Sequence, residues 1–394
     1  MEDKILNSSL IWSEIDLNAI SHNVRELCRI TSPGSRLMAV VKANGHGHGA
    51  VEVALAALKN GADCLGVARM DEGLDLRRAG ITAPILILGY TLPEHSEALV
   101  LHRLTQAVYS FEAAEALSEA AERLQTKAKV HIKVDTGMGR LGLLPDSPRI
   151  SMLGKHLPGN AQRVIESISR LPHVEIEGIF THFATADSQD KTHTLQQLER
   201  FLDFIDKLKV HGLEFPVRHA ANSAALIDLP ETHLDMVRSG ISIYGFYPSA
   251  EVNKARIALV PAMTFKTRVI HVKMVPAGFH VSYGLTYQTE NPTVIATVSA
   301  GYADGLNRLL SSRGQMLVRG SRAGIVGRIC MDLTLLDVGH IPDVCVGDEV
   351  VIFGSQGQEI IPVEEMAEAL NTLHYEIVTS LSPRVARVFI KEKR

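Results

Sequence analysis

The sequence predicts an α/β fold in which an N-terminal parallel (β/α)8 TIM barrel is followed by a C-terminal, mostly-β domain. The chain has 394 residues, which is too long for one ordinary core. Short apolar runs alternate with amphipathic stretches in its first two-thirds, and helical patterns nearly vanish between Pro248 and Val363. We therefore expect the barrel over residues 1–250, with roughly residues 1–11 packing on the second domain, and the β-rich domain over residues 251–394.

The barrel strands are predicted from apolar runs that are bounded by turn residues. These runs lie at residues 37–41, 64–68, 84–88, 105–109, 130–134, 176–182, 217–221 and 235–238. Helical patterns lie between them, at residues 17–30, 50–60, 71–79, 111–124 and 195–210. This number of repeats favours a closed barrel over an open doubly wound sheet, and no GxGxxG follows the first strand to indicate a dinucleotide site. Prolines and glycines in residues 144–164 predict a surface excursion before a helix near residues 163–171.

The second domain is predicted from a series of short strand patterns and one late helix. The strands are expected at residues 263–275, 293–300, 315–318, 321–329, 333–337 and 349–353, and the helix at residues 363–373. The length of this region is ordinary for an independent domain.

Composition excludes several classes of function. The formal net charge of −4 gives no electrostatic support for binding nucleic acid or an anionic membrane. The four cysteines show no CxxC spacing, and the N-terminus lacks the basic and long apolar regions of a signal peptide. We therefore expect a cytoplasmic protein with reduced cysteines, no membrane span and no metal site.

Lys42 carries the clearest chemical signal. It ends the buried strand predicted at residues 37–41 and is followed by the glycine-rich residues 43–49. Burial disfavours the charged ammonium, which makes the amine a better nucleophile and base, as Schiff-base chemistry requires. For an isolated strand-end lysine, the alternative is a side chain that extends to the surface.

Other polar residues follow the predicted barrel strands in the same way. They are Asp135, Arg140, His182, His219, Ser223 and Arg238. In a parallel barrel the carboxyl ends of the strands face one mouth, where active sites are built. We therefore expect these residues to gather with Lys42.

Short blocks over nearly the whole chain, taken together, resemble those of one family. They are Ala-Val-Val-Lys-Ala-Asn at 39–44 with Gly-His-Gly at 47–49, and the segments 133–142, 178–187, 219–225, 238–245, 281–284, 301–305, 327–332 and 375–376. In sequence and order they resemble the bacterial alanine racemases, which interconvert L- and D-alanine with pyridoxal 5'-phosphate. The resemblance implies the same fold, cofactor and reaction here.

The resemblance implies a two-base mechanism in a head-to-tail homodimer. Lys42 would exchange the proton of D-alanine on one face, and Tyr283 of the partner subunit would exchange that of L-alanine on the other. A free tyrosine has a pKa of about 10 and needs assistance to act as a base. His182 is implied to polarise it, with Arg238 and His219 extending the hydrogen-bonded chain. Taken alone, a strand tyrosine with a hydrated hydroxyl is the alternative.

Arg238 is implied to donate a hydrogen bond to the pyridine nitrogen of the cofactor. Because arginine stays protonated, that nitrogen would stay unprotonated and would be a weaker electron sink, which suppresses side reactions such as transamination. A strand-end ion pair is the alternative for an isolated arginine. The full set implied to contact the cofactor is Lys42, His46, Asn222, Ser223, Arg238, Gly240, Ile241 and Tyr375.

The implied substrate contacts come from both domains. Arg140 would bind the substrate carboxylate, and Met331 would contribute its backbone amide. Tyr302 and Tyr375 would narrow the entrance, which favours small side chains and leaves serine as a slow substrate. Lys133 matches a lysine that is carbamylated in many members, and a simple pairing with an acid is the alternative.

The chain departs from the family pattern beside the nucleophilic lysine. His46 stands where tyrosine is usual, Gly45 replaces alanine, and Ser239 replaces a frequent proline. Histidine also donates hydrogen bonds, and a nearby phosphate would favour its charged form. Our hypothesis is that the phosphate contact is kept but becomes more sensitive to pH.

Two other classes of protein remain as alternatives. One is a related barrel enzyme, either a broad-specificity racemase or an amino-acid decarboxylase. The other is a non-enzymatic, single-barrel protein of pyridoxal phosphate homeostasis. Decarboxylases of this scaffold place an acid at the pyridine nitrogen, where this chain has Arg238, and the single-barrel proteins lack a β domain and therefore any counterpart of Tyr283. We favour the alanine racemase, which in a bacterium would supply D-alanine for peptidoglycan.

Overall fold

The computed structural model describes residues 9–145, 151–152, 155–156 and 161–391. Contacts divide these residues into two compact units. One unit contains Ala19–Gly45 and Ala50–Pro261. The other contains the described residues up to Asn18, the short segment His46–Gly49, and the described residues from Ala262 onward.

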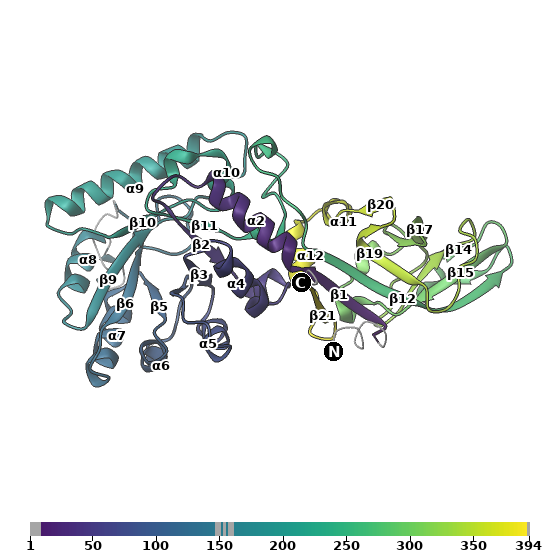
Figure 1. The fold of residues 1–394 in the computed structure, drawn as a ribbon, viewed down its shortest axis with the longest axis horizontal. Helices are drawn as coiled ribbons and strands as arrows, with labels where there is room; N and C mark the ends of the chain where they lie inside the picture. Colours follow the sequence, from purple (N-terminus) through teal and green to yellow (C-terminus); the bar gives the residue numbers. More distant parts are fainter. Residues whose placement is uncertain (1–8, 146–150, 153–154, 157–160, 392–394) are drawn as a thin grey trace. The chain divides into compact units, whose positions relative to one another are not determined.

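The first unit is built on a closed parallel barrel with the strand order β10-β11-β2-β3-β4-β5-β6-β9 (Figure 1). The strands are β2 (Arg36–Val40), β3 (Cys64–Val67), β4 (Ile85–Ile87), β5 (Thr105–Val108), β6 (Ala128–Lys133), β9 (Val174–Phe180), β10 (Val217–His219) and β11 (Met236–Ser239). The predicted (β/α)8 barrel is confirmed.

Apolar side chains fill part of the barrel interior. Met38 and Val40 of β2 pack in one cluster with Leu86 of β4, Val217 of β10 and Met236 of β11. Because β2 and β4 are not neighbours in the sheet, side chains that meet across them must point inward.

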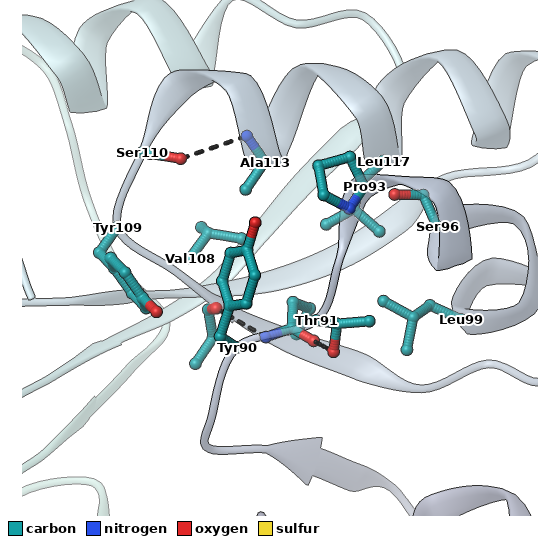
Figure 2. A pocket seen from close by; sticks show the side chains of 12 residues that line it. Tyr90, Thr91, Pro93, Ser96, Leu99, Val108, Tyr109, Ser110, Ala113 and Leu117 are labelled. Carbon is teal, nitrogen blue, oxygen red and sulfur yellow. Dashed lines mark hydrogen bonds between the residues drawn. The ribbon is translucent and has the colours of Figure 1, made fainter. Parts of the chain in front are cut away.

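Helices cover the outside of the barrel (Figure 1). They are α2 (Leu17–Ile30), α4 (Ala50–Lys59), α5 (Met70–Arg78), α6 (Ser96–Leu101), α7 (Phe111–Arg123), α8 (Ala161–Ser169), α9 (Thr192–Val210) and α10 (Ser223–Asp228). In α7, Ala114, Leu117 and Ala121 recur on one face and are buried. Ser110 caps this helix, because its Oγ accepts a hydrogen bond from the amide of Ala113 (Figure 2).

The second unit is built on a nine-stranded sheet with the order β20-β19-β16-β17-β18-β15-β12-β1-β21. The strands are β1 (Ile11–Asp16), β12 (Met263–Val275), β15 (Thr293–Val298), β16 (Gln315–Val318), β17 (Ser321–Ile325), β18 (Thr334–Asp337), β19 (Glu349–Gln356), β20 (Glu359–Ile361) and β21 (Ala386–Ile390). The mostly-β character predicted for this region is confirmed. Strand β1 comes first in the chain, yet it pairs antiparallel with β12 and parallel with β21.

One element differs from its expected bounds, and one expected segment is only partly described. The helix expected at residues 363–373 is two helices, α11 (Val363–Leu370) and α12 (His374–Thr379), because Asn371 takes a left-handed conformation and ends the first. Much of the excursion expected at residues 144–164 lies outside the described residues. Its described part contains the short strands β7 (Ser151–Met152) and β8 (Lys155–His156).

The division between the units falls after Pro261 rather than after residue 250. The intervening segment stays bound to the barrel unit through Asn23 of α2, which is fully buried. Its side-chain amide donates to the carbonyl groups of Ile243 and Val260, at 3.1 and 2.8 Å, and its Oδ1 accepts from the amide of Val260 at 2.8 Å. These bonds hold the connecting segment against α2.

We predict that Asn23→Leu lowers the free energy of unfolding by about 2–4 kcal/mol, because it leaves buried backbone groups without partners. Asn253→Ala is the matched control. Asn253 lies on the same segment but is exposed, and it caps only the amide of Ala255. That change is expected to cost about 1 kcal/mol or less. Urea unfolding followed by the helical circular dichroism signal would measure both, and equal losses would contradict the role given to Asn23.

Candidate functional site

The segment Lys42–His46 directly follows β2 and forms a left-handed turn. Its last four residues have φ angles between 48° and 61°. Left-handed conformations cost non-glycine residues about 1–2 kcal/mol each, so the turn needs support from neighbouring groups. Glu72 accepts a hydrogen bond from the amide of Ala43 at 2.7 Å, and the side chain of Asn44 accepts one from the amide of Ala50 at 3.0 Å. The strained turn therefore fixes where the chain leaves Lys42.

Lys42 itself is partly buried and has a lowered pKa. Burial is the main cause, and the nearby charge of Arg140 acts in the same direction, while Glu72 opposes it. A larger share of the amine is therefore neutral near pH 7 than for a solvated lysine.

The loop after β6 is shaped by one carboxylate. Asp135 accepts hydrogen bonds from four consecutive backbone amides, those of residues 137–140, at 2.9–3.1 Å. This arrangement fixes the backbone at Arg140, whose side chain is exposed. The guanidinium of Arg140 is thus held on a rigid loop and can receive a carboxylate.

Lys133, at the end of β6, is buried. Burial, together with the charges of Arg140 and Arg238, lowers its pKa to about 8, and Asp135 acts in the opposite direction. Its Nζ lies 5.3 Å from the centre of the Phe180 ring. The alternative considered for this lysine, a simple ion pair with an acid, is not formed among the described residues.

Arg238 on β11 is held by neutral acceptors. Its guanidinium donates to Nδ1 of His219 at 2.9 Å, to Nδ1 of His182 at 3.1 Å, and to the carbonyl groups of Thr181 and Ala220 at 2.8 and 2.9 Å. Burial and the charge of Arg140 lower its pKa to about 9, which leaves it protonated at neutral pH. Among the described residues, Nε of Arg238 has no hydrogen-bond acceptor.

The two histidines are neutral because burial and the adjacent Arg238 lower their pKa values well below the usual range. Since Arg238 only donates, each ring accepts through Nδ1 and must carry its proton on Nε2. His182 therefore presents an N–H donor on the side of the ring away from Arg238.

A group of hydrogen-bond donors lies beyond β10 and β11. Oγ of Ser223 accepts from the amide of Gly240 at 2.9 Å and lies 3.4 Å from Oγ of Ser239. Asn222 caps α10 by accepting from the amide of Ala225. Ile241 begins the 3-10 helix η3 (Ile241–Tyr244), whose first amides have no acceptor within the helix.

Strand order explains why these groups lie together. The residues come from or just after β6, β9, β10, β11 and β2, which are five successive strands of the barrel. Four cations, Lys42, Lys133, Arg140 and Arg238, belong to this set, and none forms an ion pair within the described part of the chain. An anionic ligand would supply the missing negative charge.

The candidate residues of the second unit are largely exposed. Tyr283, Met331 and Tyr302 have 69%, 52% and 42% of their surface accessible. They lie on loops that are bonded to one another, because Ser282 donates to the carbonyl of Arg328 and the amide of Tyr302 donates to the carbonyl of Cys330. His46 is buried in this unit, with its ring centre 6.5 Å from that of Tyr375.

A separate hollow of about 340 Å³ lies beyond β4 and β5 and contains none of the candidate residues (Figure 2). Tyr90, Thr91, Tyr109 and Leu117 are among its lining residues. It is therefore distinct from the group of polar residues described above.

Sequence reasoning missed Glu72 and His131. Glu72 looks like an ordinary acidic residue in the first turn of a helix, and only its bonds to the amides of Ala43 and Ala68 reveal its role. His131 lies in β6 between the apolar residues Val130 and Ile132, where the pattern indicates nothing beyond a core position. In the structure it contacts His219.

Comparison with known proteins gives the family. The family model described as "Alanine racemase, N-terminal domain" matches residues 15–248, and "Alanine racemase, C-terminal domain" matches residues 262–389. The chain belongs to the alanine racemase family. An alanine racemase of Desulfosudis oleivorans is 58% identical over 385 residues, which is 98% of this chain and 97% of that protein. One of Methanococcus maripaludis is 49% identical over 380 residues, 96% of this chain and 98% of that protein.

Solved structures of alanine racemases share the fold. That of Clostridium difficile 630 has a TM-score of 0.90 and 40% identity, covering 97% of this chain and 96% of the other. That of Bacillus anthracis with bound L-Ala-P has a TM-score of 0.89 and 38% identity, covering 97% and 95%. The predicted family and enzyme class are confirmed. Among the described residues of this alanine racemase family member, no helix is long and apolar enough to cross a membrane.

The lowered pKa of Lys133 should make the free energy of unfolding depend on pH. Between about pH 8 and 10.5 the unfolded chain binds the proton that the folded chain has lost, so this lysine makes folding more favourable as the pH rises. The difference in unfolding free energy between Lys133→Met and the parent should therefore shift in favour of the parent from pH 7 to 10.5. Urea titrations of the cofactor-free proteins at both pH values measure it, and a difference independent of pH would contradict the shift.

Proposed function

We propose that this chain racemises alanine with pyridoxal 5'-phosphate by a two-base mechanism that uses Lys42 and Tyr283 of the partner subunit. The observation that carries the proposal is the cluster of four cations without ion pairs among the described residues. A phosphorylated cofactor and an amino-acid carboxylate are the anions that such a cluster would bind.

The donor set of the barrel unit fits the cofactor. The Nε–H of Arg238 has no acceptor among the described residues, and a pyridine nitrogen can accept only if it is unprotonated. Ser223 and the amides of Gly240 and Ile241 are proposed to hold the phosphate, with Asn222 fixing the turn that presents Ser223. The amide of Gly240 donates to Oγ of Ser223 in this structure and would donate to the phosphate instead. His46 and Tyr375 are proposed to add phosphate contacts. When bound, the cofactor supplies a conjugated ring that spreads the charge left by a departing α-proton.

Lys42 is the proposed base on one face. Its lowered pKa makes the neutral amine available to accept the proton exchanged with D-alanine. Lys42 is also the residue proposed to attach the cofactor, because the same neutral amine is a nucleophile.

His182 is the proposed partner of the second base. Arg238 occupies its Nδ1, so its proton is on Nε2. An Nε2–H group can donate to a phenolate oxygen and thereby favour the charged form of Tyr283 of the partner subunit. His219 supports this arrangement from the other side of Arg238, because it accepts a hydrogen bond from the guanidinium and holds it in place.

Substrate binding is proposed to rest on Arg140, with the backbone amide of Met331 as a second donor. Carbamylation of Lys133 needs a neutral amine, which its lowered pKa favours, and the resulting anion would orient Arg140. Tyr302 and Tyr375 are proposed to narrow the entrance, which selects small side chains such as that of alanine and leaves serine as a slow substrate.

A homodimer follows from the same proposal. Tyr283 and Met331 are large, exposed residues, as expected of groups that complete a site in a second copy.

Arg238 disfavours the decarboxylase alternative, because that chemistry needs a protonated pyridine. We further propose that the enzyme works in the cytoplasm and supplies D-alanine for peptidoglycan.

The first test concerns Lys42. Incubation with pyridoxal 5'-phosphate, reduction with borohydride and peptide mass spectrometry should locate the cofactor on Lys42 of the parent and nowhere in Lys42→Ala. The variant should lose at least about 10³-fold in alanine racemisation, because it lacks both nucleophile and base. Lys59→Ala, which removes a helix-end lysine elsewhere on the barrel, is the control. Attachment that persists in Lys42→Ala would refute the assignment.

The second test concerns Tyr283. In deuterated water, Tyr283→Phe should slow exchange of the α-proton of L-alanine more than that of D-alanine, because only one of the two bases is lost. Mixing Lys42→Ala with Tyr283→Phe and allowing subunits to exchange should restore about a quarter of the parent activity, since random pairing leaves one intact shared site in half of the dimers. Equal slowing of both enantiomers, or no recovery on mixing, would contradict a shared two-base site.

A further inference from the structure

A chain of buried groups continues from Arg238 into the barrel interior, away from the proposed reaction. Nε2 of His219 lies 2.8 Å from Nδ1 of His131, and Nε2 of His131 lies 3.8 Å from Oε2 of Glu177. Lys129 pairs with the same carboxylate. His219 is fully buried and His131 is 5% exposed, so the contact between the two rings is shielded from bulk water.

The position of every proton in this chain follows from its two ends. Arg238 only donates, so His219 accepts on Nδ1 and carries its proton on Nε2. That Nε2–H must donate to Nδ1 of His131, which places the proton of His131 on Nε2. The proton then faces Glu177, a carboxylate whose pKa the contacts of His131 and Lys129 lower to about 2. At 3.8 Å this last contact is electrostatic rather than a hydrogen bond of ordinary length.

Local backbone irregularities build this arrangement. The pairing of β6 with β9 shifts register between Val130 and His131, which leaves Glu177 as an extra residue between Ile176 and Gly178. Such a bulge redirects the side chain it contains. Gly178 leaves room for the imidazole, because a Cβ there would lie 2.8 Å from Nδ1 and Cε1 of His131.

An aromatic ring holds the next group in the chain. Phe180 stacks on His219 with ring centres 4.7 Å apart and an angle of 8° between the planes. The imidazole is therefore confined from its face by Phe180 and at its two nitrogens by Arg238 and His131.

We propose that His131, oriented by Glu177, is a positioning residue that fixes His219 and through it the guanidinium of Arg238. The inference rests on the proposed function only in assigning Arg238 to the cofactor. The alternative proton pattern, with both histidine protons on Nδ1, would set an N–H of His219 against an N–H of Arg238. The carboxylate of Glu177 disfavours that pattern, because it would then face the lone pair of His131 Nε2. The chain orients Arg238 and does not conduct protons, because a guanidinium does not accept one.

The series of contacts that begins at Arg238 ends near solvent, at His131 and Glu177. His131 and Glu177 line a hollow of about 470 Å³ together with Cys64, Val217 and Met236, which lie at the amino ends of their strands. In a parallel barrel this is the end opposite the catalytic mouth. His131 and Glu177, at the end of the barrel opposite the mouth, therefore help to position Arg238 at the mouth.

The test compares His131→Leu with His131→Asn, two side chains of similar size. Asparagine keeps an acceptor near the position of Nδ1, whereas leucine leaves Nε2–H of His219 without one. For the cofactor-loaded enzyme we expect His131→Leu to lower kcat for alanine about 10- to 100-fold, as the loss of an orienting partner does at other sites, with KM within about 3-fold of the parent. His131→Asn should recover most of kcat. Equal kcat values for the leucine and asparagine variants would mean that His131 contributes only to packing, and would overturn the proposal.

A second measurement reads the protons directly and does not depend on activity. In protein labelled with ¹⁵N-histidine, the ring nitrogen shifts should show His219 and His131 protonated on Nε2. Glu177→Gln, which keeps the shape but removes the charge, should shift the Nε2 resonance of His131 while both protons stay on Nε2, whereas Glu175→Gln, an exposed change on the same strand, should leave that resonance unchanged.

The two readouts separate the inference from the proposed function. A proton on Nδ1 of His219 in the parent, or identical spectra for both glutamine variants, would overturn the inference even if the parent racemises alanine. A parent with the expected spectra but without racemase activity would overturn the proposed function and leave the proton arrangement standing.

Discussion

The site depends on one buried charge, the guanidinium of Arg238. Moving a cation out of water is costly unless hydrogen bonds and opposite charge replace its hydration. Here the replacement comes from two backbone carbonyl groups and two imidazole nitrogens, all of them neutral. The absence of a carboxylate partner among the described residues means that Arg238 keeps its full charge for a ligand. It also forces both histidines into one tautomer, because a guanidinium cannot accept a hydrogen bond.

The strand order of the barrel places the other polar residues of the site next to Arg238. β10 and β2 flank β11, so the residues that follow these three strands share one region of the mouth. The strained left-handed turn after β2 is supported by Glu72 of a neighbouring helix, and the loop after β6 is supported by Asp135. In both cases a carboxylate binds backbone amides, and the nearby lysine or arginine forms no ion pair with any residue that the structure describes. The carboxylates of Glu72 and Asp135 thus hold the backbone in place, and the charges of Lys42 and Arg140 are not neutralised by them.

Much of this could be predicted from the sequence because it depends on local patterns. The alternation of apolar runs with helical stretches predicts the barrel, and polar residues directly after strands point to Lys42, Arg140, His182, His219 and Arg238. What the sequence could not reveal depends on long-range geometry. The acceptors of Arg238 lie 18 or more positions away along the chain, and the bulge that exposes Glu177 to His131 exists only once β6 and β9 pair. The place of β1 in the C-terminal sheet likewise depends on pairing partners far along the chain.

Four neighbouring cations without ion pairs among the described residues are energetically costly for the protein. Burial and mutual repulsion lower the pKa values of Lys42, Lys133 and Arg238 together, which means that each charged form is less favourable here than in water. A bound anion would relieve all of these costs at once, so binding and stability are coupled. The same repulsion keeps the amine of Lys42 reactive, and it would weaken as anions enter. The repulsion among these cations would thus favour the binding of negatively charged ligands, and it already favours the neutral amine of Lys42.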